Sequence, residues 1–448
     1  MDFIIVGAGP TGLTLAWLLR KHAVTIIDSA PSIGGCHRVV RQNGEFTEHG
    51  PRVYSSAYKT VEALLQNIGT SWDDIFTPYK FNMGTIGGRT WQSLHARELL
   101  QLTSAYIQRA FGRDYSKTTM REFIAAWSES SRDYIERVCV LTDGQRADTY
   151  PVDKFLQLIN QQMGLYKLYQ PKAPNDEGLF KIWGDELTAS GVTIRLNEKC
   201  LSVQGQTVIT DKHTYTAPNI ILAVPPRTLA QINVVPRAWA DAASYIDYIT
   251  VNFRFPIKSL PSTWGFPATA WGLAHIVVSD YWDGQDHDRD VTISCGITNV
   301  DAPDRNGKTA RQSTDDYVVQ ETLNQLRESY PTLPRPTSAH IGSRIGQESA
   351  FVGDNFIPAQ IRPGLYNAGT QNGKSQYAYT SMETAVANAT ALANELAPET
   401  RSMLQPIPAW TLNQALLLAL VIVIVLVCVV YFTSMYTINA STDVTNIA

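Results

Sequence analysis

Residues 2–40 have the sequence DFIIVGAGPTGLTLAWLLRKHAVTIIDSAPSIGGCHRVV, and their order of apolar residues and glycines predicts the architecture around them. The apolar run Phe3–Val6 is short and rich in β-branched residues, as expected of a buried parallel strand. The turn GAGPTG at residues 7–12 then opens a helix that runs through Leu19. A second apolar run, Val24–Ile27, ends in Asp28. This order predicts a dinucleotide-binding β-α-β unit, and therefore an α/β fold.

Each glycine of this turn has a distinct expected task. Gly7 permits a tight turn, Gly9 lets a pyrophosphate approach the backbone, and Gly12 lets the helix pack closely on the strand. The carboxylate of Asp28 is placed to accept hydrogen bonds from both hydroxyls of an adenosine ribose. A strand-to-helix turn without any ligand is the alternative, but the acid at the end of the second strand favours a nucleotide. The residues expected to bind it are Gly7, Gly9, Pro10, Thr11, Gly12, Asp28 and Ser29.

The extension SAPSIGG at residues 29–35 separates flavin proteins from nicotinamide dehydrogenases. With it, the segment resembles the N-terminal FAD motif of the flavin amine oxidase superfamily, which includes monoamine and polyamine oxidases, protoporphyrinogen oxidase, carotenoid desaturases and, more distantly, UDP-galactopyranose mutase. The resemblance implies that Gly34 and Gly35 wrap the adenosine and pyrophosphate of FAD. Cys36 and His37 intervene before Arg38, a spacing that looks more like protoporphyrinogen oxidase, and Arg38 is the implied pyrophosphate partner.

A second glycine-containing loop, HGPR at residues 49–52, also resembles protoporphyrinogen oxidase, although HGPRVYSSAYKTV looks like the mutases as well. The family places this loop beneath the flavin ring, which implies that Gly50, Pro51 and Arg52 contact the cofactor. Arg52 is also a candidate catalytic residue. Its alternative interpretation is an ordinary arginine of a surface loop.

The stretch GLYNAGTQNGKSQYAYTSMETAVANATALANEL at residues 364–396 resembles the C-terminal flavin motif of the family. The resemblance implies that Gly369 lies near the flavin. The backbone amides of Met382 and Glu383, at a helix N-terminus, would stabilise negative charge on reduced flavin. Tyr377 and Tyr379 are further candidate catalytic residues. In the middle of the chain, the resemblance implies a backbone contact between Val203 and the adenine.

One departure from the family concerns the stretch YITVNFRFPIKSLPSTWGFP at residues 248–267, which resembles the substrate-domain strand of protoporphyrinogen oxidase. Amine oxidases commonly carry a lysine there that holds a water near flavin N5, but this chain has Ile249, Thr250, Val251 and Asn252. His49, His275 and His340 are candidate acid–base groups in principle, and each is more simply interpreted as a surface or packed histidine. We therefore expect hydride chemistry that depends on the flavin rather than on an acid–base pair.

The expected fold class is α/β, a Rossmann-like FAD-binding domain with an interleaved α+β substrate domain and a C-terminal transmembrane helix. The FAD-binding domain is assigned to residues 1–95, 175–235 and 340–397, and the substrate or cap domain to 96–174 and 236–339. Residues 398–411, with three prolines, are expected to be a linker. Residues 412–432 are assigned to the membrane anchor and 433–448 to a short tail.

The run Ala415–Phe432 has eighteen residues without a charge, and with Leu412 it can span the roughly 30 Å of a bilayer core. Trp410 on one side and Tyr431 on the other fit interfacial positions. A buried core helix would show a polar face, which this run lacks. The N-terminus begins directly with the strand that the nucleotide site needs, so we expect a tail anchor in the lipid bilayer with the flavin domain facing the cytosol.

Composition excludes several other classes. A formal net charge of −4 and a pI near 6.1 give no reason to expect a nucleic-acid partner. The five cysteines have no zinc-site spacing, which predicts a reducing compartment and no metal. No cysteine lies within residues 364–396, so the FAD is expected to be non-covalent.

These features predict a membrane-anchored FAD-dependent oxidoreductase that takes a hydride from an amine-bearing or apolar small molecule. One alternative is a redox-neutral isomerase like the sugar-nucleotide mutases, in which N5 of reduced flavin acts as a nucleophile. Another is a non-catalytic membrane scaffold that retains the flavoprotein fold. The sequence identifies neither the substrate nor the oligomeric state.

Overall fold

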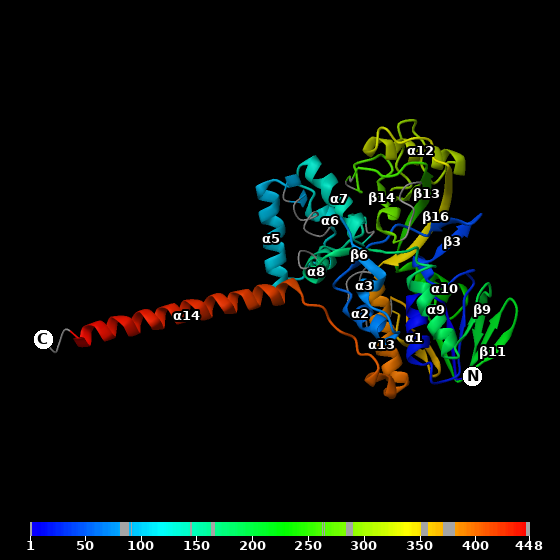
Figure 1. Cartoon of the computed structure of the whole chain (residues 1–448), viewed down its shortest axis with the longest axis horizontal. Coiled ribbons are helices and arrows are strands. Elements are labelled where there is room, and N and C mark those ends of the chain that lie inside the picture. Colours follow the sequence, from blue (N-terminus) through cyan, green and yellow to red (C-terminus); the bar gives the residue numbers. More distant parts are fainter. Residues whose placement is uncertain are drawn as a thin grey trace.

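The computed structural model describes residues 2–80, 89–90, 92–143, 146–162, 166–261, 263, 265–283, 290–350, 357–370 and 381–444. Its body contains two larger sheets with a group of helices beside them, and one long helix projects from it (Figure 1). Tyr377 and Tyr379 lie outside the described residues, so their role stays a prediction.

A six-stranded sheet has the strand order β17-β18-β12-β1-β2-β8. Its strands are β1 (Phe3–Val6), β2 (Val24–Ile27), β8 (Thr193–Arg195), β12 (Asn219–Leu222), β17 (Gln360–Arg362) and β18 (Leu365–Asn367). All but β17 run parallel to their neighbours, and Phe3 stands opposite both Val24 and Asn219. The β-α-β unit expected at residues 3–28 is confirmed, because α1 (Pro10–Leu18) connects β1 to β2.

Apolar residues cover both faces of this sheet. One face packs on four helices, α1, α2 (Lys59–Asn67), α9 (Leu179–Ala189) and α13 (Met382–Leu396), around fully buried residues such as Leu13, Trp183 and Val386. The other face packs on α10 (Pro226–Gln231) and on a three-stranded sheet of β9 (Cys200–Gln204), β10 (Thr207–Thr210) and β11 (Thr214–Thr216). Since both faces are buried, β1, β2 and β12 are nearly continuous apolar runs.

A four-stranded antiparallel sheet forms the second layer, in the order β14-β15-β13-β16. Its strands are β13 (Ser244–Phe255), β14 (Leu273–Val277), β15 (Val291–Ile297) and β16 (Ser338–Ala350). Phe253, Ile293 and Leu326 belong to the core between this sheet and α12 (Asp315–Ser329). The opposite face meets the hairpin of β3 (Val39–Gln42) and β4 (Glu45–Glu48). β16 runs across the domain boundary expected at 339/340, so the first part of the segment assigned to the FAD domain belongs to this sheet.

A helical subdomain, which we define as α5 (Ala96–Ala110), α6 (Met120–Phe123), α7 (Glu129–Asp143) and α8 (Val152–Gln162), has its own core. The amphipathic stretch TMREFIAAWSES at residues 119–130 does not form one continuous helix. α6 ends at Phe123, and the hydroxyl of Ser128 accepts a hydrogen bond from the amide of Ser131 at the start of α7. Such a serine interrupts the pattern because its side chain caps a new helix.

The remaining elements connect these layers. They are β5 (Tyr54–Ser55), α3 (Trp72–Ile75), β6 (Phe76–Pro78), β7 (Leu168–Pro171), α11 (Arg237–Asp241) and the 3₁₀ turns η1 (Gly35–His37), η2 (Val278–Tyr281) and η3 (Pro398–Ser402). A turn at Asn43-Gly44 connects β3 to β4, with positive φ at both residues.

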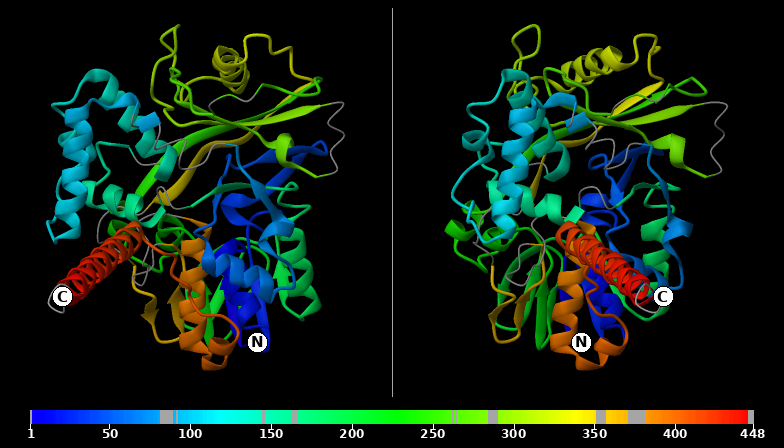
Figure 2. Two further views of the ribbon diagram at one scale, coloured as in Figure 1. Left: turned by 60° about the vertical axis from the view of Figure 1, so that its left-hand side comes forward. Right: turned by 90° about the vertical axis from the view of Figure 1, so that its left-hand side faces the viewer.

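The segment at residues 398–411, expected to be a linker, instead packs on the body. Thr400 and Leu404 are buried, and the amide of Ile407 donates to the hydroxyl of Thr60 at 3.0 Å. α14 (Leu412–Val444) then leaves the body on the side of the helical subdomain (Figure 2). Within its stretch Leu412–Thr433, an 18-residue window has a mean hydropathy of 3.4 and none of that window is buried. Among the described helices, α14 is the one long and apolar enough to cross a membrane.

Candidate functional site

The carboxyl ends of the parallel strands bring together residues that are far apart in the sequence. Gly7 follows β1, Asp28 follows β2 and Gly369 follows β18 after one residue. A side chain at Gly369 would stand 3.3 Å from the carbonyl oxygen of Val224, the second residue after β12. Open sheets of this kind bind ligands in the crevice outside their carboxyl edge, so this edge is the candidate site.

Two glycine turns lie face to face there. The amide of Gly34 donates to the carbonyl of Ala8 at 2.8 Å, and a Cβ added to Gly35 would stand 2.9 Å from Cα of Gly9. Gly34 and Gly35 have φ values of +114° and +56°, which are strained for other residues. The Gly34-Gly35 turn therefore lies against the N-terminal turn, while its contact with the adenosine and pyrophosphate of FAD stays a prediction.

The glycines of the N-terminal turn serve different needs. A Cβ on Gly12 would lie 1.9 Å from the carbonyl oxygen of Gly7, and a Cβ on Gly7 would lie 2.4 Å from the carbonyl oxygen of Ala223. A Cβ on Gly9 would meet nothing closer than 3.5 Å, and Gly9 has an ordinary φ of −78°. The fold thus requires Gly7 and Gly12 but tolerates a side chain at Gly9. A bare Gly9 fits a ligand that lies against the backbone, as a pyrophosphate does.

The N-terminus of α1 fits the same anionic group. Gly9 is the N-cap residue and offers no side-chain acceptor, and Pro10 at the first helical position has no amide hydrogen. The amides of Thr11 and Gly12 have no acceptor within the helix, as is usual in a first turn. These amides and the helix dipole favour a bound phosphate.

The carboxylate of Asp28 joins the turns on either side of it. One oxygen accepts from the amide of Ala8 at 2.6 Å and the other from the amide of Ala30 at 2.7 Å. Each oxygen can accept a second hydrogen bond, so the half-buried carboxylate can still bind ribose hydroxyls. Ser29, predicted beside it, is exposed.

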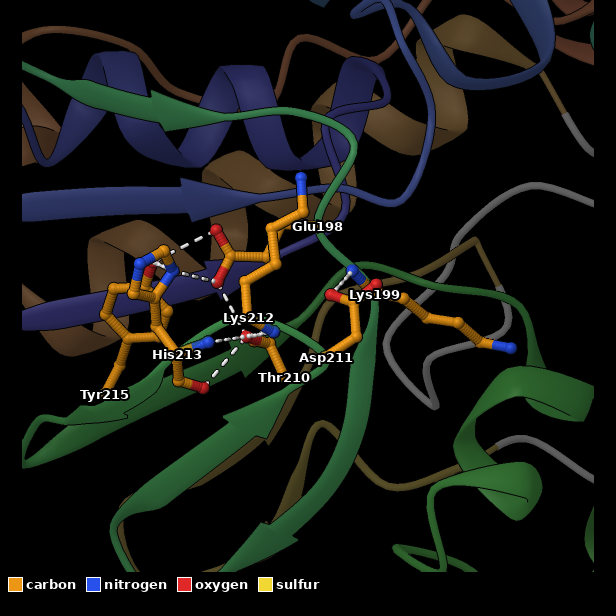
Figure 3. A network of polar contacts seen from close by, with 7 residues as sticks. All are labelled: Glu198, Lys199, Thr210, Asp211, Lys212, His213 and Tyr215. Carbon is orange, nitrogen blue, oxygen red and sulfur yellow. Dashed lines mark hydrogen bonds and ion pairs between the residues drawn. The ribbon is translucent and has the colours of Figure 1, made fainter.

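A network of polar contacts around the buried Glu198 was missed from the sequence (Figure 3). The carboxylate of Glu198 accepts from Thr210 Oγ1 at 2.6 Å and from Tyr215 OH at 3.1 Å, and it lies 3.1 Å from Nδ1 of His213. The amide of Glu198 donates to the carbonyl of Asp28 at 2.9 Å. The small sheet is thereby tied to the residue that should hold the ribose. Val203 pairs with Val208 in that sheet, and its contact with adenine stays a prediction.

The start of α13 agrees with the helix expected at Met382. Ser381 is its N-cap, so Met382 and Glu383 occupy the first two helical positions, whose amides have no intrahelical acceptor. The side chain of Glu383 has a different task. Its two oxygens accept from the amides of Thr60 at 2.9 Å and Val61 at 3.0 Å, which caps α2.

The loop at residues 49–52 lies between the Gly34-Gly35 turn and the four-stranded sheet. Arg52 Nη2 donates to the carbonyl of Cys36 at 3.3 Å, and a Cβ on Gly296 would touch Pro51 at 3.5 Å. The guanidinium of Arg38 donates to the carbonyl of Gly35 at 2.8 Å. Arg52 is half-buried, which disfavours its interpretation as a surface arginine.

Glu48, directly before this loop, is buried against the four-stranded sheet. Thr250 Oγ1 donates to its carbonyl at 3.3 Å, and Asn252 and Ser294 stand opposite each other on the same sheet face. Burial raises the pKa of the Glu48 carboxyl to about 7, although Ser294 and Arg52 favour the ionised form. The strand that lacks the family's lysine thus directs Thr250 and Asn252 toward the main-chain carbonyl of Glu48. Nothing in the sequence indicated that the side chain of Glu48 would be buried here.

The three candidate histidines lie in different surroundings. His275 is buried on the α12 side of the sheet, 3.2 Å from Tyr330 OH, and burial lowers its pKa to about 4. His340 lies 2.7 Å from Glu45 beside a pocket of about 160 Å³ between the β3–β4 hairpin and the sheet. The ring of His49 packs edge-on against Tyr248. No two of these histidines share a cluster among the described contacts.

The chain matches two family models. Residues 5–68 match an NAD(P)-binding Rossmann-like domain, and residues 176–397 match flavin containing amine oxidoreductase. No curated protein sequence matches the chain.

Solved structures share the fold at low sequence identity. Putrescine oxidase bound to putrescine has 16% identity and a TM-score of 0.61, covering 89% of this chain and 99% of that one. Cyclohexylamine oxidase from Brevibacterium oxydans has 15% identity and a TM-score of 0.60, covering 88% and 99%. A candidate protoporphyrinogen oxidase from Exiguobacterium sp. 255-15 has 15% identity and a TM-score of 0.61, covering 89% and 99%.

The two family models cover the two parts of the chain that form the candidate site, and the bare Gly9, the α1 N-terminus and Asp28 fit a dinucleotide there. The chain is a flavin-dependent oxidoreductase, with FAD as its implied cofactor, and belongs to the superfamily of flavin-containing amine oxidoreductases.

Proposed function

We propose that this protein is a membrane-anchored oxidoreductase that removes a hydride from an amine-bearing or apolar small molecule and binds FAD non-covalently. The observation that carries the proposal is the bare backbone at Gly9, which the fold does not require, beside the first turn of α1 and the carboxylate of Asp28. Bound FAD supplies the hydride acceptor, and the protein supplies binding, orientation and charge.

The residues of this chain divide that work between them. The amides at the start of α1 hold the pyrophosphate, and Asp28 holds the ribose. The amides of Met382 and Glu383, in the first turn of α13, would stabilise negative charge on the bound cofactor, because a helix N-terminus favours anions. Arg52, fixed on the carbonyl of Cys36, orients the cofactor or the substrate.

The substrate class rests on two kinds of support. Two of the similar structures are named as oxidases of amines, putrescine and cyclohexylamine. In this chain the four-stranded sheet offers Thr250 and Asn252 where those enzymes' family commonly has lysine. We therefore propose an amine-bearing or apolar substrate whose oxidation does not depend on a lysine-held water.

The flavin part of the proposal is tested on the purified full chain. It should be yellow, and acid precipitation should release the flavin into the supernatant. Colour that stays with the pellet would show a covalent link, and a colourless protein that takes up no FAD would contradict the proposal. Anaerobic mixing with amines should bleach the flavin, whereas a mutase-like isomerase would leave oxidised flavin unbleached and need reduced flavin for activity.

The membrane part is tested separately. The full chain should resist carbonate extraction, because a stretch such as Leu412–Thr433 inserts into a bilayer. Deletion from Trp410 onward should leave a soluble flavoprotein. The shortened chain retains Thr400 and Leu404, which are buried in the body. Protease added outside intact vesicles should cleave the flavin domain if it faces the cytosol. Protection of that domain would reverse the proposed orientation.

A further inference from the structure

Helix α5 exposes an apolar surface at the edge of the body. Leu100, Ile107 and Phe111 are 70%, 49% and 88% exposed. Their spacing of seven and four residues places them on one side of the helix. The other exposed residues between them, Gln101, Thr103, Ser104 and Ala110, carry no charge. Such a surface is unusual for a helix that faces only water.

Several hydrogen bonds fix α5 relative to the root of α14. Tyr106 OH donates to Asn413 Oδ1 at 2.7 Å and lies 3.1 Å from Asn160 Oδ1, and the amide of Asn413 donates to that same oxygen at 2.9 Å. Tyr166 OH donates to the carbonyl of Trp410 at 2.6 Å. The helical subdomain is therefore held at the level of the first turn of α14.

The length of the apolar segment shows where the membrane surface must lie. The 22 residues of Leu412–Thr433 correspond to about 33 Å of helix, which is little more than the roughly 30 Å of a bilayer core. The hydrocarbon boundary therefore falls at the first turn of α14, the turn that Tyr106 contacts. α5 runs across the direction of α14 at the body edge from which α14 leaves (Figures 1 and 2). The exposed side of α5 is consequently placed in the headgroup layer.

We infer that the outer face of α5, formed by Leu100, Ile107 and Phe111, is a second lipid-contact surface that lies in the bilayer interface beside the anchor. Arg97 and Arg113, both exposed, stand at the two ends of this face, where their charges can reach lipid phosphates. Trp410, 59% exposed, adds an aromatic side chain of the kind enriched at this depth. The inference rests on the proposed anchoring of α14, and it adds that the body is held in one orientation on the membrane.

The experiment uses the full chain in vesicles of radiolabelled phosphatidylcholine containing an anionic lipid. Benzoyl-phenylalanine, a photo-crosslinker, is placed in separate variants at Ile107 and at Phe111. Leu420, in the middle of α14, is the positive control. Leu201 is the matched control, because it is 47% exposed but lies on β9, on the far side of the body from α14. All four side chains are exposed, so the substitutions should leave the fold intact.

Illumination should attach labelled lipid at positions 107 and 111 as well as at 420, with only background labelling at 201. Lipid labelling at position 420 with only background labelling at positions 107 and 111 would overturn the inference while leaving the anchor intact. Crosslinking of 107 and 111 to a second copy of the chain or to another protein would also overturn it. Background labelling at 420 would instead refute the anchoring itself. The additional change of Leu100 to Glu, made in the Phe111 variant, should reduce lipid labelling at 111, since a charged residue opposes entry of α5 into the interface.

Discussion

The carboxyl edge of the six-stranded sheet is built mainly from backbone, whereas the inner face of the four-stranded sheet is built from side chains. At the first, two glycine turns touch, and amides and carbonyls form the surface. At the second, Glu48, Asn252 and Ser294 are buried together. The candidate cofactor edge therefore depends on the backbone of neighbouring turns, whereas the inner face of the four-stranded sheet depends on side chains that segments far apart in the sequence bring together.

The largest effect should come from adding a methyl group to Gly12 in the N-terminal turn. The same change at Gly9, made in a separate variant, is the comparison. Gly12→Ala places Cβ 1.9 Å from a backbone oxygen that cannot move without breaking the β1–α1 packing, so folding should fail, at a cost above about 3 kcal/mol. Gly9→Ala meets only ordinary contacts and should change the stability of the flavin-free protein by less than about 1 kcal/mol. Its flavin content should nevertheless fall.

Thermal unfolding and the ratio of flavin to protein absorbance distinguish these outcomes. If Gly9→Ala keeps a full complement of flavin, the pyrophosphate does not lie on this turn. If Gly12→Ala folds normally, the close approach of Gly7 and Gly12 is wrong.

The second prediction concerns the side-chain region. Glu48 has a pKa near 7 in the folded protein against a usual 4.5, so the folded state retains its proton over that interval. The protonated Glu48 carboxyl therefore contributes to the stability of the folded state, and this contribution is complete below pH 4.5 and is lost as the pH rises to 7. The difference between the folded and the usual pKa corresponds to about 3 kcal/mol in the free energy of unfolding. Glu48→Gln should therefore gain stability relative to the wild type as the pH rises from 4.5 to 7, by up to about 3 kcal/mol.

Comparison with the wild type at each pH is essential, because His275 has the opposite dependence. Burial lowers its pKa to about 4, so its contribution is lost as the pH falls below 6.5. Glu45→Gln is the matched control on the same strand. The pKa of Glu45 is lowered from its usual 4.5 by hydrogen bonds from Ser338 and His340, so its contribution to stability is complete above pH 4.5. Relative to the wild type, this variant should lose stability as the pH rises toward 4.5 and should show no further change between pH 4.5 and 7. Urea unfolding with excess FAD, repeated across the pH range, measures the free energy of unfolding of both variants. If that free energy depends on pH in the same way for Glu48→Gln and the wild type, the prediction is contradicted.

The same contrast explains what the sequence could predict. The β1–α1–β2 unit, the Gly34-Gly35 turn and the start of α13 at Met382 follow from local constraints, because a short glycine-rich turn between apolar runs allows few backbones. The capping of α2 by Glu383 joins residues 323 positions apart, and nothing near either residue indicates it. Nor did any local pattern indicate the burial of Glu48 or the packing of Leu404 on the body, since both depend on tertiary contacts.

The smallest effect separates the two tasks of Asp28. Its carboxylate accepts from the amides of Ala8 and Ala30 and is also the proposed ribose acceptor, so a loss of function alone would not say which task matters. Asp28→Ala should weaken FAD binding by about 1.5–3 kcal/mol, roughly 10- to 150-fold in Kd, the range for hydrogen bonds to a charged acceptor. Asp28→Glu should recover part of this loss because it keeps the charge.

His213→Ala supplies the contrast. It removes a partner of Glu198 but leaves the carboxylate of Asp28 in place, so it should lower the melting temperature with little change in Kd. Titration of the flavin-free variants with FAD, together with their melting temperatures, tests the assignment. Equal Kd values for Asp28→Ala and His213→Ala would mean that Asp28 only supports the turn and that another residue binds the ribose.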